Sequence, residues 1–481
     1  MPSELPAIAR NLMGRSAGLY VRAFVAASIA VAAFFALSYA ASFVDRQGIA
    51  AKLKAANARG ELAQTWAGWS GRAIPRFHGN DCLMLGALLQ DYPGRLAETL
   101  SARIPPADAQ PPPRAGDPTI PACLQLIAAL EWPDPADPNA IFYHRYLHGQ
   151  RVFAALALAV VSPAALGWIT LLANALLLLS VLVPALRRRN EGWREHGYAA
   201  IAATLLLFDG LWLFGIYFSF SISDLVLAAF VACAYHAGIA RGDERRFVTA
   251  VALFGVATAI FEFLTGGIPF GLALLLGLVA LDGPADRDAL LWRAFHGSLI
   301  FALAIALTFA IKLVLVMLFV DPNVLADFRS ALSTRVGASF IDSLPPQEVA
   351  WLAAHGIDVA SLDRHWIFAL LYMLARLAYA TFVIGFGSPV LGMIIMGAAV
   401  IASAALLIRR WRNAPRGVAR TRLLILLGSA LVMPAWSLVF VNHTLLHAVW
   451  MVRPFAWFIA LAGLLLWWPA EDRAAAQNPG R

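Results

Sequence analysis

The chain has 481 residues, of which 60% are hydrophobic and 14% are charged, whereas about 25% of the residues in a typical soluble domain are charged. Together with a mean hydropathy of +0.70, this composition excludes an ordinary soluble globular protein and predicts an all-α polytopic membrane protein. The formal net charge of +8 reflects arginines that cluster in short loops between apolar runs. We interpret this charge as a determinant of topology and expect no nucleic-acid partner.

Ten apolar runs have about the length that a helix needs to cross a bilayer. The predicted transmembrane helices lie at about 22–43, 152–186, 198–217, 224–240, 247–263, 269–282, 295–320, 388–408, 423–441 and 454–470. If the N-terminus is cytoplasmic, so are the arginine-rich loops "RRRNEGWREHG", "RGDERR", "DGPADRDALLWRA" and "RRWRNAPRGVARTR". The short outer loops "FSFSISD" and "LTGGIP" contain no arginine or lysine, and the positive-inside rule therefore favours this orientation.

This topology divides the chain into five segments. They are a cytoplasmic N-terminal segment with the first transmembrane helix (1–43), a large proline-rich outer loop with interfacial helices (44–151), transmembrane helices 2–7 (152–320), a second outer loop with an interfacial helix (321–387), and transmembrane helices 8–10 with a cytoplasmic C-terminal tail (388–481). The first apolar run can instead be a signal peptide, because "LSYAAS" offers the small residues of a cleavage site.

The apolar segment 364–387 does not fit this count. An eleventh transmembrane helix at this place would move the arginine-rich loop 409–422 to the outside. Arg376 lies at its centre, where a charge that faces lipid costs about 2.5–3.5 kcal/mol. We therefore expect an amphipathic helix at the outer surface. The alternative is an eleventh transmembrane helix whose Arg376 faces the interior of the bundle.

The three cysteines fall in two environments. Cys82 and Cys123 both lie in the first outer loop, where an oxidising compartment allows them to form a disulfide. Cys233 falls within the fourth predicted helix, where we expect a buried free thiol.

Most ionisable residues outside the cytoplasmic loops are expected at the outer face. They are Asp45, Asp81, Arg145, His148, Asp224, Glu262, His443, His447 and Arg453, and Asn442 accompanies them. Ionisable groups at membrane depth are costly, so they usually line a cavity and pair with one another. We therefore predict an outward-facing pocket that binds a lipid-linked anion and performs acid/base chemistry. Asp209 lies apart from this group, and its role is open between helix packing and proton relay.

Several of these residues also have a simpler interpretation. Asp224 can be the N-cap of its helix, and Asp45 can belong to a solvated helix end. His443 and His447 are four residues apart and share a helical face, where they can bond to backbone groups or bind zinc. A catalytic zinc site needs a third ligand and usually a general base. The intervening sequence "TLL" contains no glutamate, so we expect no metal.

Four local motifs, "NDCLML", "YHRYLHG", "FEFLTGG" and "NHTLLHAVWMVR", resemble motifs of bacterial membrane proteins that include pilin arabinofuranosyltransferase-like enzymes. The many predicted helices, the large loop after the first of them and the interfacial helices resemble the GT-C class of membrane glycosyltransferases. The resemblance implies transfer of a sugar, such as arabinofuranose, from a polyprenyl-phosphate donor to a protein or glycan acceptor. It places the active site on the periplasmic side of the bacterial inner membrane and requires no cofactor.

The resemblance also implies roles for individual residues. In that class an acidic residue follows the first transmembrane helix closely, as Asp45 does here, while Asp81 lies in the local motif. Either carboxylate can be the general base, and we expect Asp81 first and Asp45 second. The residues expected to bind the donor phosphate are Arg453, His443, His447, Arg145 and His148. The residues expected to bind sugar hydroxyls are Glu262, Asp224 and Asn442.

Two other functions remain as alternatives. An O-antigen ligase or polymerase-like enzyme also uses outer arginines and histidines, but its dominant outer loop comes late in the chain. A lipid or glycan transporter often has paired half-repeats and a site at the membrane midplane, and this sequence has neither feature. The sugar, the acceptor, the stereochemical outcome and the oligomeric state are left open.

Overall fold

The computed structural model describes residues 5–63, 65–67, 73–75, 77, 79–105, 121–132, 134–208, 217–262, 266–336, 346–354, 356, 372, 389–446 and 451–468. Within these ranges the chain is mainly helical, and its strands form two small two-stranded sheets. No sequence pattern indicated these sheets. Asp209 and Arg376 lie outside the described residues, as does the predicted interfacial helix at 364–387 apart from Tyr372.

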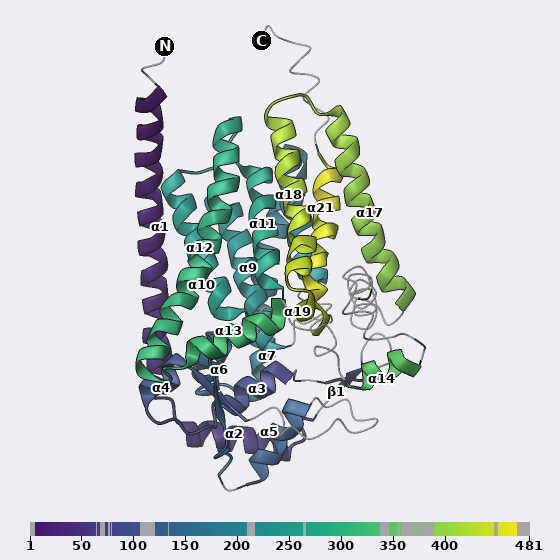
Figure 1. The fold of residues 1–481 in the computed structure, drawn as a ribbon. Helices are drawn as coiled ribbons and strands as arrows, with labels where there is room; N and C mark the ends of the chain where they lie inside the picture. Colours follow the sequence, from purple (N-terminus) through teal and green to yellow (C-terminus); the bar gives the residue numbers. More distant parts are fainter. Residues whose placement is uncertain are drawn as a thin grey trace.

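Among the described residues, six helices are long and apolar enough to cross a membrane, which makes the chain a multi-pass membrane protein. They are α1 (Leu5–Ala41), α7 (Pro163–Arg187), α9 (Phe218–Ala237), α12 (Arg287–Phe319), α17 (Pro389–Asn413) and α18 (Val418–Val439). In α9, 78% of the apolar stretch is buried, compared with 17% in α17. α9 is therefore a central helix of the bundle, whereas α17 lies at its edge (Figure 1).

Within the described ranges, four shorter helices pack against these six, and Figure 1 shows α10, α11 and α21 alongside them. They are α8 (Trp193–Thr204), α10 (Glu244–Phe261), α11 (Gly267–Asp282) and α21 (Trp457–Leu466). α8 packs on α7 and α21, α10 packs on α1 and α12, and α11 packs on α18. Short loops join α9 to α10, α10 to α11 and α11 to α12 along the chain. Asp243 and Asp286 cap α10 and α12, respectively, by accepting hydrogen bonds from backbone N–H groups.

The predicted transmembrane helix at 152–186 is two helices, so this part of the prediction is wrong. α6 (Gly149–Leu158) ends before a short turn, and α7 begins at Pro163. Proline lacks the backbone N–H of a helix interior but suits the first helical position. Pro163 therefore starts a new helix after the turn. Cys233 also differs from expectation, because its side chain is exposed and not buried.

The remaining elements gather at the lower end of the bundle in Figure 1, away from the start of α1. Between α1 and α6 lie α2 (Arg46–Ala58), α3 (Gly79–Ala87), α4 (Arg95–Leu100) and α5 (Pro121–Glu131). The antiparallel sheets pair β1 (Thr65–Ala67) with β2 (Ala73–Pro75) and β3 (Ala102–Ile104) with β4 (Ile141–Tyr143). α13 (Val324–Val336) and α14 (Pro346–Ala354) follow α12 at the same end.

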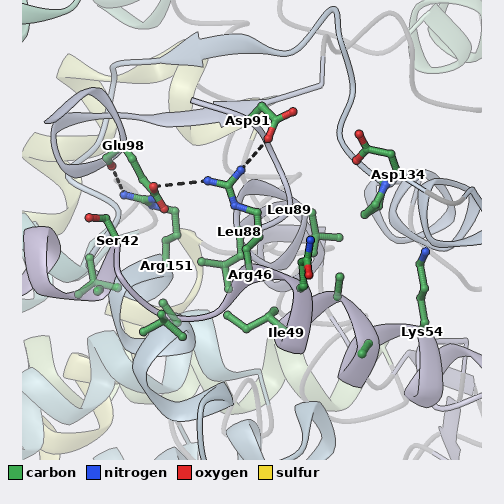
Figure 2. A pocket seen from close by; sticks show the side chains of 18 of the residues that line it. Ser42, Arg46, Ile49, Lys54, Leu88, Leu89, Asp91, Glu98, Asp134 and Arg151 are labelled. Atoms are coloured by element: carbon green, nitrogen blue, oxygen red, sulfur yellow. Dashed lines mark hydrogen bonds and ion pairs between the residues drawn. The ribbon is translucent and has the colours of Figure 1, made fainter. Parts of the chain in front are cut away.

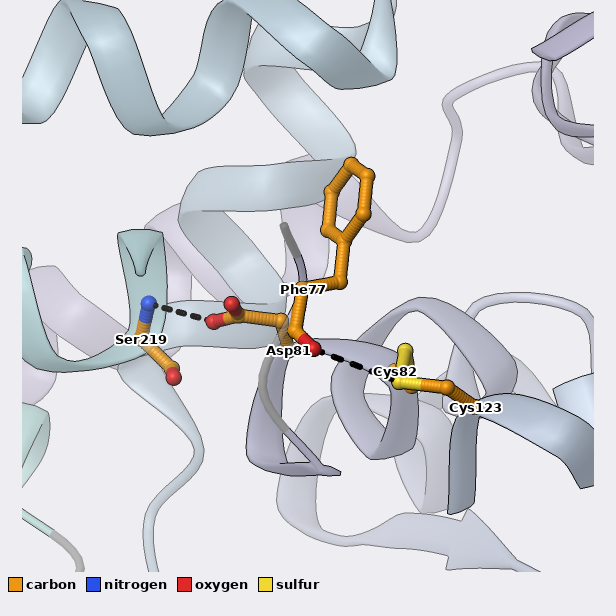
Figure 3. Close-up of a disulfide and its surroundings, with 5 residues drawn as sticks. All are labelled: Phe77, Asp81, Cys82, Cys123 and Ser219. Carbon is orange, nitrogen blue, oxygen red and sulfur yellow. Dashed lines mark hydrogen bonds between the residues drawn. A yellow bond between two sulfur atoms is a disulfide. The ribbon is translucent and has the colours of Figure 1, made fainter. Parts of the chain in front are cut away.

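A disulfide joins α3 to α5 through Cys82 and Cys123, whose Cα atoms are 5.0 Å apart (Figure 3). Both cysteines are buried. The bond closes a long loop, and a loop of this size restricts the unfolded chain enough to stabilise the fold by about 4 kcal/mol. The disulfide thus fixes the position of α3, the helix that carries Asp81.

Replacing both Cys82 and Cys123 with serine is expected to lower the free energy of unfolding by about 2–4 kcal/mol. The measurement is thermal unfolding of the purified protein in detergent, with and without a reducing agent. The control is Cys233→Ser, which changes the exposed free cysteine and is expected to leave the Tm unchanged. A double variant that unfolds at the wild-type temperature would contradict the prediction.

Candidate active site

The candidate site is built around the first two turns of α9. Their sequence, "FSFSISD", inserts three serines and an aspartate into an otherwise apolar helix. Ser219, Ser223 and Asp224 are all buried. Serine side chains are small, so other parts of the chain can approach the helix closely here. Three separate segments of the chain bring a charged side chain to these turns.

The first is Asp81 on α3, which accepts a hydrogen bond from the backbone N–H of Ser219 at 2.9 Å (Figure 3). Asp81 is only 1% exposed. The N-terminal turn of a helix has free N–H groups and a positive end of the helix dipole, both of which favour a carboxylate. Asp81 is therefore oriented by α9, and the disulfide of the adjacent Cys82 fixes its helix to α5.

The second is Glu262, which directly follows α10. It is 2% exposed and accepts a hydrogen bond from the Ser223 hydroxyl at 2.6 Å. Gly267 permits this approach, because a Cβ at that position would lie 2.0 Å from a carboxylate oxygen of Glu262. Gln150 on α6 donates a hydrogen bond to the carbonyl of Phe261. These contacts fix the end of α10 against both α6 and α9.

The third is Arg453, which begins the short 3-10 helix η5 (Arg453–Ala456). Its guanidinium forms a hydrogen-bonded ion pair with Asp224 and lies 5.8 Å from the centre of the Phe220 ring. The side chains of Arg453 and Asp224 are 1% and 6% exposed. Asp224 lies inside α9 and not at its start, so the N-cap interpretation of this residue is wrong. The pair joins the C-terminal part of the chain to α9.

His443 and Asn442 lie on α19 (Val441–Leu446), and both are buried. Arg335 on α13 donates a hydrogen bond to the Nδ1 atom of His443. His447 lies outside the described residues. The structure thus places a second guanidinium beside the histidine that was expected to bind phosphate.

Tyr146 lies between β4 and α6 and is buried. Burial raises the pKa of its hydroxyl, and the charges of Arg335, Arg145 and Glu262 also act on it. Arg145 is the sequence neighbour of Tyr146, whereas Arg335 and Glu262 belong to distant segments of the chain. Arg145 itself is exposed, with its guanidinium 5.8 Å from the Tyr143 ring centre.

A buried lysine of α12 fixes the position of the segment 143–148. Lys312 on α12 is fully buried and donates hydrogen bonds to the carbonyls of His144 and Tyr146. His144 is hydrogen-bonded through Nδ1 to the Ser101 hydroxyl at 2.9 Å. His148 adopts a left-handed backbone conformation with φ of 58°, and its Nε2 atom donates to the Tyr143 carbonyl at 2.7 Å. His148 therefore shapes this segment through the backbone.

The free energy of unfolding is expected to fall as the pH is lowered from 7 to 5. Burial, with the nearby charge of Lys312, holds the pKa of His148 well below its ordinary value. In this pH range the unfolded chain binds a proton that the folded chain excludes, so acid favours unfolding. His144 acts in the same direction, because burial and Lys312 also lower its pKa.

The measurement is the Tm at pH 7 and pH 5 for the wild type and for His148→Asn. Asparagine tolerates the left-handed conformation, so the variant is expected to fold and to have a shallower pH dependence. His236→Asn changes an exposed histidine and serves as the control. An unchanged pH dependence in His148→Asn would contradict the assignment.

Asp45 lies elsewhere, at the N-terminus of α2. Its carboxylate accepts a hydrogen bond from the backbone N–H of Gln47 at 3.0 Å, and the residue is exposed. This is the geometry of an N-cap. Of the two candidate bases, the structure brings Asp81 to α9 and assigns Asp45 a capping position.

Several residues of this site had no distinctive sequence signal. The serines of "SFSIS" marked an outer loop in the sequence and not a helix start, while Arg335 lies in an outer segment with several other charges. Within the described ranges, no three residues among histidine, cysteine, aspartate and glutamate are grouped to hold a metal ion. The site consists of carboxylates, guanidinium groups, a histidine and hydroxyls.

Such a set can bind an anion and hydroxyl groups and can accept a proton. Protein-family models, curated proteins and solved structures were compared with the chain, and none of them matches it.

Proposed function

We propose that the chain is a membrane glycosyltransferase that moves a sugar from a polyprenyl-phosphate donor to a protein or glycan acceptor. The observation that carries this proposal is the convergence of Asp81, Glu262 and Arg453 on the first two turns of α9. All three are buried at one end of a membrane bundle. Buried ionisable groups in such a bundle are costly to maintain and usually serve a substrate pathway or a reaction.

The membrane arrangement is part of the proposal. The six long helices, together with α8, α10, α11 and α21, are proposed as ten transmembrane helices. The loops at 187–194 and 409–422 are rich in arginine. The turn between α17 and α18 lies at the upper end in Figure 1, and Arg194 and Arg422 both bond to the end of α11. The positive-inside rule makes that end cytoplasmic. The site then faces the periplasm, in a bacterial inner membrane.

Asp81 is proposed as the general base. The acceptor oxygen forms a bond to the anomeric carbon of the sugar while the bond from that carbon to the phosphate oxygen breaks. The acceptor proton passes to Asp81, and the bonding electrons leave with the lipid phosphate. Arg453, Arg335 and His443 stabilise the phosphate charge that develops, and Glu262, Asp224 and Asn442 bind sugar hydroxyls. This scheme uses no metal or other cofactor.

The proposal is tested with purified protein in nanodiscs. Synthetic polyprenyl-phosphate sugars are offered in one arm and polyprenyl-pyrophosphate glycans in another, and both binding and turnover are measured. Binding of the monophosphate donors with slow release of free sugar supports the proposal. If well-folded wild type binds no polyprenyl-phosphate sugar, the donor assignment is wrong. Turnover of the pyrophosphate arm alone identifies a ligase or polymerase-like enzyme, and binding without any turnover identifies a transporter.

A further inference from the structure

A cavity of about 820 Å³ lies at the lower end of the bundle, outside the contacts of the α9 site. We call it the α2 cavity. Its walls come from the end of α1, from α2, from the residues after α3, from α4, from the segment at 134–135 and from α6. Figure 2 shows apolar side chains such as Ile49, Leu88 and Leu89 on one side and charged side chains around them.

The charged side chains form a row in which acids and bases alternate. Arg46 pairs with Asp91 at 2.8 Å and with Glu98 at 3.5 Å, and Glu98 lies 3.6 Å from Arg151 (Figure 2). The side chains of Glu98 and Arg151 are 13% and 6% exposed. Lys54 and Asp134 add one charge of each sign. The lining therefore contains three positive and three negative groups and is neutral in sum.

This pattern selects against charged ligands. An anion meets three carboxylates, and a cation meets two guanidinium groups and an ammonium group. A ligand of either charge also has to separate ion pairs that already exist in the wall. Separating a partly buried pair leaves one member without compensation, which is costly.

A neutral ligand with many hydroxyls has no such cost. A carboxylate has about four lone-pair positions and a guanidinium five N–H donors, so paired groups retain hydrogen-bonding capacity. The Nε atom of Arg151 is buried and has no hydrogen-bond partner among the described residues. Sugar hydroxyls both donate and accept, as this row requires, and the C–H faces of a sugar suit the apolar side. The volume lies within the range of pockets that enclose a ligand.

Two helices, α6 and α3, connect the α2 cavity to the α9 site. On α6, Arg151 enters the cavity wall while its neighbour Gln150 binds the carbonyl beside Glu262. Leu88 of the cavity follows the helix that carries Asp81, and seven residues of helix correspond to about 10 Å. In the acceptor role proposed below, a ligand of several sugar rings extends from the cavity toward α3, the helix that carries Asp81.

We propose that the α2 cavity binds a neutral, polyhydroxylated ligand, a carbohydrate. In combination with the proposed function, on which this role rests, the carbohydrate is the acceptor. The carbohydrate-binding assignment stands on the alternating charges, the unpaired Arg151 Nε atom and the volume of the cavity, and it does not require the donor chemistry.

The test is equilibrium binding of neutral arabino-, manno- and malto-oligosaccharides and of anionic oligogalacturonides to the full chain in nanodiscs. Ala51 lines the cavity on α2, whereas Ala55, also exposed on α2, does not. Ala51→Trp fills the cavity and is expected to weaken binding of the neutral series at least tenfold, as is Glu98→Gln. The matched control Ala55→Trp is expected to bind as wild type does, and the Tm of each variant establishes that it folds.

Four results would overturn the proposal, of which three concern the binding of oligosaccharides. They are no binding of any neutral oligosaccharide to wild type, equal binding to Ala51→Trp and wild type, and tighter binding of the oligogalacturonides. Displacement of a bound oligosaccharide by phosphatidylethanolamine would also overturn it and make the cavity a lipid headgroup site.

Donor hydrolysis without an acceptor separates this inference from the proposed function. Ala51→Trp is expected to retain hydrolysis of the polyprenyl-phosphate sugar and to lose transfer to an oligosaccharide. If wild type binds oligosaccharides but no donor, the proposed function fails and the carbohydrate site stands. If the donor is hydrolysed but Ala51→Trp transfers sugar normally, the acceptor role of the cavity is wrong and the proposed function stands.

Discussion

Replacing Arg453 with glutamine is expected to abolish sugar transfer and to lower the free energy of unfolding by about 3–5 kcal/mol. The substitution leaves the carboxylate of Asp224 buried without its counter-ion, and a buried charge without compensation is strongly destabilising. The lost guanidinium is also the group proposed to stabilise the departing phosphate. The measurements are the Tm in detergent and the turnover of a polyprenyl-phosphate sugar.

A double variant separates these two effects. Asp224→Asn with Arg453→Gln removes both charges, and replacement of a complete buried pair is often nearly neutral for stability. We expect this variant to regain most of the lost stability and to remain inactive. The control is Arg59→Gln, which breaks the surface pair with Glu61 and is expected to cost less than about 1 kcal/mol. Normal turnover in the folded double variant would show that the pair is structural only.

Asp81→Asn is expected to reduce sugar transfer by about 10²–10⁴-fold without loss of donor binding, because asparagine cannot accept the acceptor proton. The amide oxygen of asparagine can still accept the hydrogen bond from the Ser219 N–H, so the local fold is expected to survive. Single-turnover rates, donor affinity and Tm are measured together. A fall in rate with unchanged affinity and Tm identifies a chemical role.

The matched control is Asp45→Asn. Asparagine is as good an N-cap as aspartate, so α2 keeps its hydrogen bond to Gln47 and the variant is expected to fold and to turn over normally. Loss of activity in Asp45→Asn together with normal activity in Asp81→Asn would reverse the assignment. Asp81 would then serve only to cap α9.

The sequence identified Asp81, Asp224 and Arg453 as candidate site residues, but it did not identify their partners. Asp224 and Arg453 were each recognisable as polar residues at the ends of apolar runs, and 229 residues separate them. The pair forms only because η5 returns to α9 in the folded bundle. Arg335 could not be distinguished in the sequence from other outer arginines. Only the packing of α13 against α19 brings it to His443.

The membrane character of the chain follows from the sequence alone, because hydrophobicity is summed along a continuous segment and needs no knowledge of neighbours. The same holds for the arginine-rich loops, which bound most of the apolar runs. The helix break before Pro163 was missed, because apolar residues on both sides of this proline form one continuous run at 152–186.

Only the tertiary structure decided which polar residues meet. It placed Asp81 at the N-terminus of α9 and Asp45 at the N-terminus of α2, although both follow the first helix and both are aspartates. It also formed the alternating row of Asp91, Arg46, Glu98 and Arg151 from three helices and a connecting segment. The reason is physical: burial fixes a polar residue by its partners, and those partners come from distant segments whose approach depends on the packing of the whole bundle.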